Sequence, residues 1–159
     1  MLEKGGQASV PSMSDMEKVA KSPGDPSRRR RGRPSDDTPT VLVVDDEPHL
    51  LRLLSSTFEK SGYRVLAARD GPGAVAEFER KHATIDAVFL DVGIPPAGIG
   101  CALERMLAIR RDVGLVLMSG DDLHEGLRAT LDAHGGHFVR KPFARANALR
   151  ALRLAMGER

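Results

Sequence analysis

Five short apolar runs, each followed by a segment of helical periodicity, constrain the fold of this chain most strongly. The apolar runs are expected to be strands and cover residues 40–44, 63–68, 85–90, 113–118 and 137–140. The segments expected to be helices cover residues 48–60, 72–81, 100–111, 121–134 and 143–156. This alternation predicts an α/β fold, in which a doubly wound, five-stranded parallel sheet has helices on both faces and right-handed crossovers.

The spacing of apolar residues predicts which side of each helix is buried. In the first helix, Leu50, Leu51, Leu54 and Phe58 share one face, and Gly62 is a typical C-terminal signal after it. Asp121 or Asp122 is expected to cap the fourth helix. The inward residues expected in the other helices are Ala74, Val75, Phe78, Leu103, Met106, Leu107, Leu149, Leu152 and Met156.

Five polar residues lie at or just beyond the ends of four of these apolar runs. They are Asp45, Asp46, Asp91, Ser119 and Lys141. In an open parallel sheet, ligands bind in the crevice beyond the carboxyl ends of the strands, so these side chains are expected to converge there. Three neighbouring carboxylates repel one another unless a cation lies among them, and a hard divalent ion suits such a site.

In sequence order, these residues and their neighbours resemble the receiver domain of two-component response regulators. The matching motifs are Val-Leu-Val-Val-Asp-Asp-Glu-Pro at 41–48, Phe-Leu-Asp-Val-Gly-Ile-Pro at 89–95, Leu-Met-Ser-Gly at 117–120 and Phe-Val-Arg-Lys-Pro-Phe at 138–143. Each motif alone is weak, but all four occur in order at strand ends. The resemblance covers roughly residues 39–157 and implies a flavodoxin-like fold with strand order 2-1-3-4-5.

The resemblance also implies a phosphoacceptor and not an enzyme with an external substrate. Asp91 would take a phosphoryl group from a histidine kinase or a phosphotransfer protein. Mg²⁺ would be held by Asp46, Asp91 and the main-chain carbonyl of Gly93, with Asp45 binding the ion directly or through water. Lys141 would bind one phosphoryl oxygen, and the hydroxyl of Ser119 would donate a hydrogen bond to another.

The same resemblance suggests how the signal leaves the domain. Ser119 would move toward the phosphoryl group, and Phe138 would turn inward behind it, although a plain core role for Phe138 is nearly as well supported. The affected face would be formed by residues 121–134, 137–140 and 143–156, and it would bind a downstream protein or a second copy as a homodimer. The loop after Asp91, with Pro95, Pro96 and several glycines, departs from the family pattern and can contain one extra residue.

Residues 1–38 have the composition of a disordered basic leader before a receiver domain at 39–159. The leader has eight Lys and Arg against six Asp and Glu, whereas the remaining residues have sixteen of each, which argues against a nucleic-acid surface on the domain. Arginines at 28–31 and 33, around Gly32 and Pro34, resemble a minor-groove DNA-binding hook. A solvated basic tail, or a tail that contacts acidic surfaces, is the favoured interpretation. Met13 or Met16 is an alternative translation start.

The remaining features concern the cellular setting and the rival functions. Cys101 is the only cysteine, so no internal disulfide is possible and a reducing cytoplasm is the expected location. Its side chain is expected to be a small buried one. No apolar stretch is long enough for a membrane span, and the chain ends one helix after Lys141, which indicates a stand-alone receiver. One alternative function is a DNA-associated regulator that uses the leader. Another is a phosphatase with an aspartyl nucleophile, but that class has an Asp-x-Asp motif at the end of its first strand, where this chain has Asp45 and Asp46 followed by Glu47.

Overall fold

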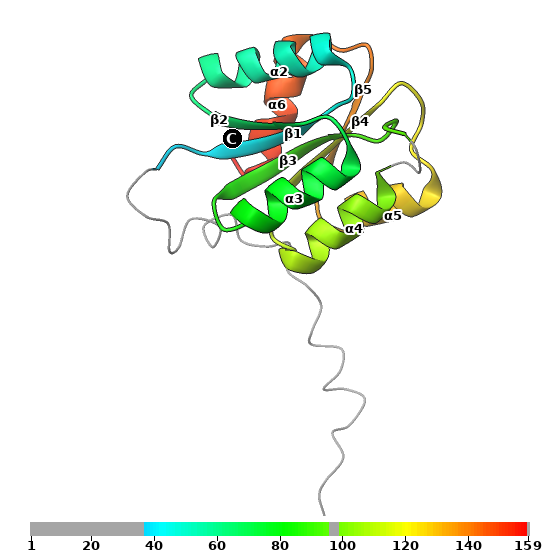
Figure 1. The fold of residues 1–159 in the computed structure, drawn as a ribbon. Coiled ribbons are helices and arrows are strands. Elements are labelled where there is room, and N and C mark those ends of the chain that lie inside the picture. The colour runs from blue at the N-terminus through cyan, green and yellow to red at the C-terminus, as the bar shows by residue number, and fades with distance from the viewer. Residues whose placement is uncertain (1–36, 96–98, 159) are drawn as a thin grey trace, which may run out of the picture.

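A parallel five-stranded sheet forms the centre of the computed structural model, which describes residues 37–95 and 99–158 (Figure 1). Its strands, in the spatial order β2-β1-β3-β4-β5, confirm the predicted order 2-1-3-4-5. Their bounds are β1 Thr40–Val44, β2 Arg64–Ala68, β3 Ile85–Asp91, β4 Gly114–Ser119 and β5 His137–Arg140.

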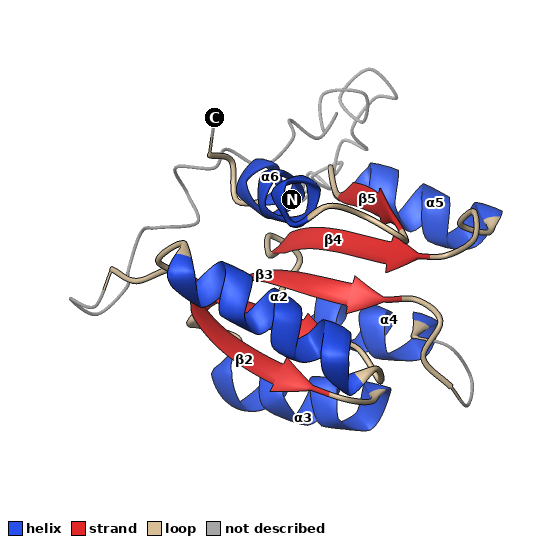
Figure 2. Cartoon of the chain, turned by 90° about the horizontal axis from the view of Figure 1, so that it is seen from above, coloured by secondary structure: helices blue, strands red, loops and turns tan. Residues whose placement is uncertain are grey.

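Five helices cover the two faces of this sheet. Their bounds are α2 Pro48–Lys60, α3 Gly71–Lys81, α4 Gly100–Ile109, α5 Glu125–Ala133 and α6 Arg145–Ala155. α2 and α6 lie side by side on one face, and α3, α4 and α5 lie on the other (Figures 1 and 2). The fold is therefore the doubly wound, flavodoxin-like arrangement that the sequence predicts.

Alternate residues of each central strand belong to different core layers because successive strand side chains point to opposite faces. Leu42, Val44, Val88 and Leu90 pack with α3, α4 and α5. Val41, Val43, Ala87 and Phe89 pack with α2 and α6. Burial of each large apolar side chain stabilises the fold by roughly 1.5–3 kcal/mol. The strands are therefore held from both sides as they lead to the carboxyl edge of the sheet, where the polar residues are predicted to converge.

The helix faces match the periodicity closely. Leu51, Leu54 and Phe58 of α2 are buried, as are the predicted inward residues of α3 and α4. Leu50, Leu149 and Met156 are only partly buried, at the margin of the same core layer. Gly62 follows α2 with a φ of 90°, the left-handed conformation that favours glycine after a helix.

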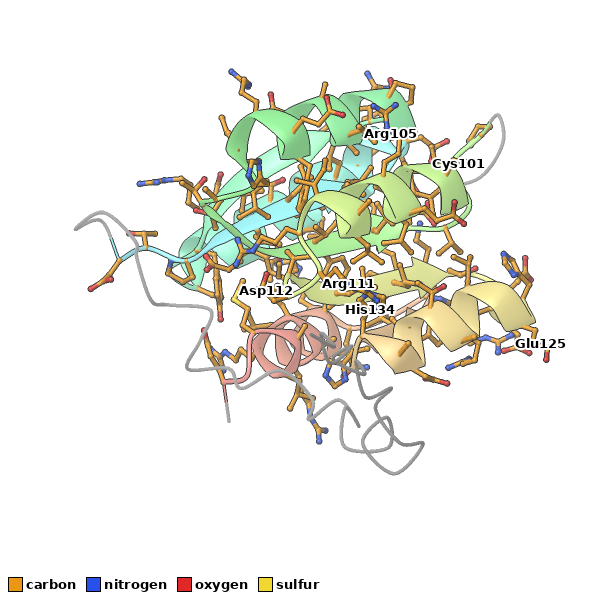
Figure 3. All side chains as sticks on the ribbon, turned by 90° about the horizontal axis from the view of Figure 1, so that it is seen from below. Cys101, Arg105, Arg111, Asp112, Glu125 and His134 are labelled. Atoms are coloured by element: carbon orange, nitrogen blue, oxygen red, sulfur yellow. The ribbon has the colours of Figure 1, made fainter. Side chains whose placement is uncertain are left out.

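Two sequence predictions about individual residues are wrong. His124, not Asp121 or Asp122, caps α5, since its Nδ1 atom accepts a hydrogen bond from the Leu127 N–H at 3.3 Å. The helix begins later than predicted because Asp121 donates its N–H to Ser119 Oγ in the turn after β4. Cys101 is exposed on the outer side of α4 and is not buried (Figure 3).

No helix among residues 37–95 and 99–158 is long and apolar enough to cross a membrane. The predicted leader and its arginine-rich segment lie almost entirely outside the described residues. Its disorder, its boundary with the domain and its relation to DNA therefore stay predictions.

Candidate phosphoacceptor site

The site lies at the carboxyl edge of the sheet, where three neighbouring strands end together. The strand register places Val44 beside Leu90 and Asp91 beside Met118. It also pairs Ser119 with Arg140, the residue before Lys141. Because Asp45 follows Val44 directly, the sheet brings the polar residues predicted from strand ends to one edge.

Lys141 connects two of the acidic residues at this edge. Its Nζ atom lies 3.0 Å from Asp45 Oδ2 and 2.9 Å from Asp91 Oδ2. The main chain of Lys141 is also held, because its N–H donates to the Ser119 carbonyl at 2.7 Å. The peptide bond between Lys141 and Pro142 is cis. The ammonium group is thus fixed between the first and third strands.

The carboxylates differ in their surroundings. Asp45 is fully buried and accepts the Glu47 N–H at 2.8 Å, whereas Asp46 is exposed. Asp91 is nearly buried, and its Oδ1 accepts the Gly93 N–H at 3.0 Å. Both oxygens of Asp91 therefore have a hydrogen-bond donor in this structure, one from the main chain and one from Lys141.

Burial and charge act against each other at this site. Burial raises the pKa of Asp45, although the Glu47 N–H and Lys141 partly offset that effect by stabilising its charged form. Burial alone would lower the pKa of Lys141, but its bonds to Asp91 and Asp45 outweigh that effect and raise it. The ammonium group is therefore held in its charged form next to the carboxylates.

A divalent cation fits the donor atoms that are present. Asp45, Asp46 and Asp91 each offer a carboxylate oxygen, and these atoms lie within 4.8 Å of one another. Three carboxylates and one ammonium leave a net negative charge, and hard oxygen donors suit Mg²⁺. Gly93 lies two residues after Asp91, and a Cβ atom added to Gly93 would lie 3.4 Å from Asp91 Oδ1. The role of its carbonyl as a metal ligand stays a prediction.

Ser119 is nearly buried at the end of β4, one residue past the strand partner of Asp91. Its Oγ atom accepts the Asp121 N–H at 3.1 Å, which leaves the hydroxyl hydrogen free to donate elsewhere. The structure thus holds the Ser119 hydroxyl at the carboxyl edge of the sheet, where the carboxylates lie. A hydrogen bond from this hydroxyl to a phosphoryl oxygen stays a prediction.

Phe138 lies in β5, beside Leu117 of β4. It is half-buried and packs against the core layer on the α5 side. The guanidinium carbon of Arg128 lies 5.3 Å from the centre of its ring, a distance suited to a cation–π contact. The sequence analysis missed this contact because nothing in the local pattern pairs α5 with β5.

The pKa of Asp45 leads to a pH prediction for the metal-free protein. Its carboxyl group titrates above its ordinary value of 3.8 when folded, so the folded state binds the proton more tightly than the unfolded state. Protonation of Asp45 therefore contributes to the free energy of unfolding. We expect this contribution to be fully present below pH 3.8 and to be lost as the pH rises through the raised pKa of the folded state. Urea unfolding in EDTA should show this slope in the wild type and not in Asp45→Asn, and equal slopes would contradict it.

A groove beside Lys141 was also missed by the sequence analysis. It has a volume of about 440 Å³, and its lining is largely apolar: Glu47, His49, Leu50, Leu53, Lys141, Pro142 and Phe143. The signal that could have revealed it is Leu53, an apolar residue on α2 that lies beside the buried stripe and is only partly covered. The groove opens next to the carboxylates and places apolar surface beside the charged site.

Comparison with known proteins places this chain in a family. The model of the response regulator receiver domain matches residues 41–153. The chain therefore belongs to the response regulator receiver domain family, whose members are phosphoacceptor signalling domains that work with histidine kinases or phosphotransfer proteins.

Curated relatives support this assignment. The chain is 34% identical over 117 residues to the probable transcriptional regulatory protein TcrX of Mycobacterium tuberculosis, covering 74% of this chain and 47% of TcrX. It is 32% identical over 106 residues to the nitrogen assimilation regulatory protein NtrX of Azorhizobium caulinodans, covering 65% and 23%. This chain thus spans half or less of the length of the relatives that it matches.

Solved structures show the same fold at lower identity. A CheY-like receiver domain from Methanospirillum hungatei has a TM-score of 0.68 at 19% identity, covering 76% of this chain and 94% of that chain. A CheX–CheY complex with BeF₃ and Mg²⁺ from Borrelia burgdorferi has a TM-score of 0.65 at 24% identity, covering 73% and 87%. These likenesses concern the arrangement of strands and helices.

Proposed function

We propose that this chain is a phosphorylation switch in which Asp91 accepts a phosphoryl group from a phosphohistidine. The observation that carries the proposal is the position of Lys141 Nζ, within 3.0 Å of both Asp45 and Asp91. It places a positive charge beside Asp91, the predicted nucleophile, which is nearly buried at the end of its strand. Residues 39–159 would be the receiver domain and residues 1–38 a separate leader.

In the proposed reaction, one carboxylate oxygen of Asp91 attacks phosphorus while the bond from phosphorus to the histidine nitrogen breaks. The electron pair of that bond goes to the imidazole of the donor, which then takes up a proton. Lys141 would turn from Asp91 to a phosphoryl oxygen, and the free hydroxyl hydrogen of Ser119 would donate to another. These contacts neutralise charge where an anion approaches an anion.

The acidic residues would hold Mg²⁺, which when bound offsets the repulsion between Asp91 and the incoming phosphoryl group. Asp46 and Asp91 would be carboxylate ligands, Asp45 would bind the ion directly or through water, and the Gly93 carbonyl is the proposed main-chain ligand. Asp46 suits this role because it is exposed, so the ion can reach the site without unfolding the buried part.

Phe138 would act as the aromatic element of the switch. We expect Phe138→Ala to accept the phosphoryl group like the wild type but to bind its downstream protein more weakly, because the inward position of a phenyl ring depends on apolar burial alone. Amide chemical shifts of α5 should change less on activation in Phe138→Ala than in a Phe138→Leu control. Equal changes in all three proteins would contradict a switch role.

Beryllofluoride with Mg²⁺, the combination present in the CheX–CheY complex, provides a test of the proposed function. We expect Mg²⁺ alone to shift the amides next to Asp45, Asp46 and Asp91. Adding beryllofluoride should then shift those near Ser119 and in α5, and it should have no effect without Mg²⁺. A protein that ignores both additions would contradict the proposal.

The rival functions lead to different results. The phosphatase would release phosphate repeatedly from a small phosphomonoester, whereas the switch would take up a single phosphoryl group. The DNA-associated regulator would bind A·T-rich duplex in a salt-dependent way that deletion of residues 1–38 abolishes. We further propose a cytoplasmic location, a phosphohistidine donor, and a downstream protein that binds the face formed by α5, β5 and α6.

A further inference from the structure

The charge of this chain is distributed unevenly along its last two elements. Residues 134–157 contain five Lys and Arg and no Asp or Glu, although residues 39–159 as a whole have sixteen of each. Lys141 is used inside the phosphoacceptor site. Among the exposed arginines, Arg140 of β5 and Arg150 of α6 lie on the same side of the molecule, and they give this side a positive charge.

A groove lies on this same side of the molecule. Its volume is about 450 Å³, and it runs between β5 and α6. Its apolar lining includes Phe138, Phe143 and Leu154, and its polar lining includes Arg140, Asn147 and Arg150. No carboxylate is among the residues that line it. We call these six residues, with the surface between them, the β5–α6 groove.

The apolar residues of the β5–α6 groove are unusually accessible. Leu154 is 43% exposed, and only one other large hydrophobic residue of the described part of the chain, Ile109, belongs to the same exposed class. Phe138 and Phe143 are half-buried. An apolar strip with a positively charged rim suits a partner that brings apolar side chains together with carboxylates.

The arginines around the groove are available to such a partner. Arg150 forms no ion pair with any residue of the described ranges. Arg140 pairs with Asp122 at 2.7 Å, but both side chains are more than half exposed, so water screens that pair. Arg128 lies over the ring of Phe138 at the other margin of the strand. Two guanidinium groups, those of Arg140 and Arg150, therefore line the β5–α6 groove.

We infer that the β5–α6 groove binds an acidic, amphipathic segment of another protein, with apolar side chains against Leu154 and Phe143 and carboxylates on Arg150 and Arg140. This inference rests on the proposed function, in which this face is the output face, and it specifies the chemistry of the partner. A second copy related by a twofold axis would bring two acid-free β5–α6 grooves together, and their arginines would repel each other. The leader of this chain is itself basic, so it lacks the complementary charge.

The test uses synthetic amphipathic peptides of four helical turns, with leucine along one face and glutamate along the other. A matched peptide has glutamine in place of every glutamate. Binding of each to the full chain is measured by fluorescence anisotropy, with and without Mg²⁺ and beryllofluoride. We expect the glutamate peptide to bind at least about tenfold more tightly than the glutamine peptide, and less tightly as salt rises.

Three variants locate the contact. Arg150→Glu and Leu154→Ser should each weaken binding of the glutamate peptide, the former by about tenfold or more. Arg111→Glu makes the same charge change at an exposed residue outside the groove and should alter affinity by less than about twofold (Figure 3). In the wild type, amide shifts caused by the peptide should fall in β5 and α6.

The inference is overturned if both peptides bind equally, if neither binds, or if Arg111→Glu weakens binding as much as Arg150→Glu. It is also overturned if sedimentation shows a dimer that Arg150→Glu dissociates, because the occupant is then a second copy. Phosphoryl uptake from acetyl phosphate is measured on the same samples by intact mass. Uptake without peptide selectivity contradicts this inference alone, and selectivity without uptake contradicts only the proposed function.

Discussion

Asp91→Asn is expected to abolish uptake of a phosphoryl group. Asparagine keeps the size of the side chain and can still accept the Gly93 N–H, but its amide lacks the charged oxygen that attacks phosphorus. We expect intact-mass spectra of the wild type, incubated with acetyl phosphate and Mg²⁺, to show one added phosphoryl group. Asp91→Asn should show none, a loss of at least about a hundredfold in rate.

The matched control for this experiment is Asp112→Asn, which removes an exposed carboxylate that pairs with Arg110 at 2.9 Å. It should be phosphorylated as fast as the wild type. Uptake by Asp91→Asn at the wild-type rate would mean that a different side chain is the acceptor.

Lys141→Met is expected to have the largest effect on stability among single substitutions at the site. The side chain of Lys141 is 22% exposed, and its two partners are 0% and 8% exposed, so its removal leaves two buried carboxylates without their counter-charge. Loss of one member of a buried ion pair typically costs about 3 kcal/mol or more. We expect urea unfolding in EDTA to show a loss of about this size at neutral pH.

Two further measurements separate this electrostatic effect from lost packing. Mg²⁺ should restore part of the stability of Lys141→Met, because the ion compensates the same carboxylates, and lowering the pH should restore part by protonating Asp45. The control is Lys81→Met, which removes a partly exposed lysine that lies 3.5 Å from Glu77. It should cost less than about 1 kcal/mol. A loss in Lys141→Met that neither Mg²⁺ nor acid reduces would contradict the electrostatic explanation.

The layered fold could be predicted from sequence because buried residues recur with a different period in strands and in helices. Val41 and Leu42 face different core layers, as expected for a strand covered on both sides, and Leu54 and Phe58 recur at helical spacing on α2. The order of the strands could not be obtained in this way, because local patterns do not state which strands are neighbours. The order 2-1-3-4-5 came from the family resemblance.

The composition of the site could be anticipated because one rule covers it: parallel strands end at a common edge. That rule brings Asp45, Asp91 and Lys141 together without knowledge of their side-chain directions. It does not say that Lys141 bridges the two carboxylates, that the N–H of Gly93 donates to Asp91, or that a groove opens beside them. These features depend on rotamers and loop paths, which the sequence pattern does not encode.

The two errors have identifiable causes. An Asp before a helix is a common cap, but Asp121 is held in the turn after β4 by Ser119, so the cap falls to His124. Cys101 was expected inside on the preference of its residue type. Its position relative to Leu103, Met106 and Leu107 is a better guide, because it lies off the buried stripe of α4.

The central claim is that the phosphoryl group is attached to Asp91, and chemical trapping measures this directly. Borohydride reduces an aspartyl phosphate to homoserine, which tandem mass spectrometry locates in a peptide digest. After incubation with acetyl phosphate and Mg²⁺, we expect homoserine at position 91, and none when EDTA replaces Mg²⁺. Homoserine at position 45 or 46, or at no position, would contradict the account.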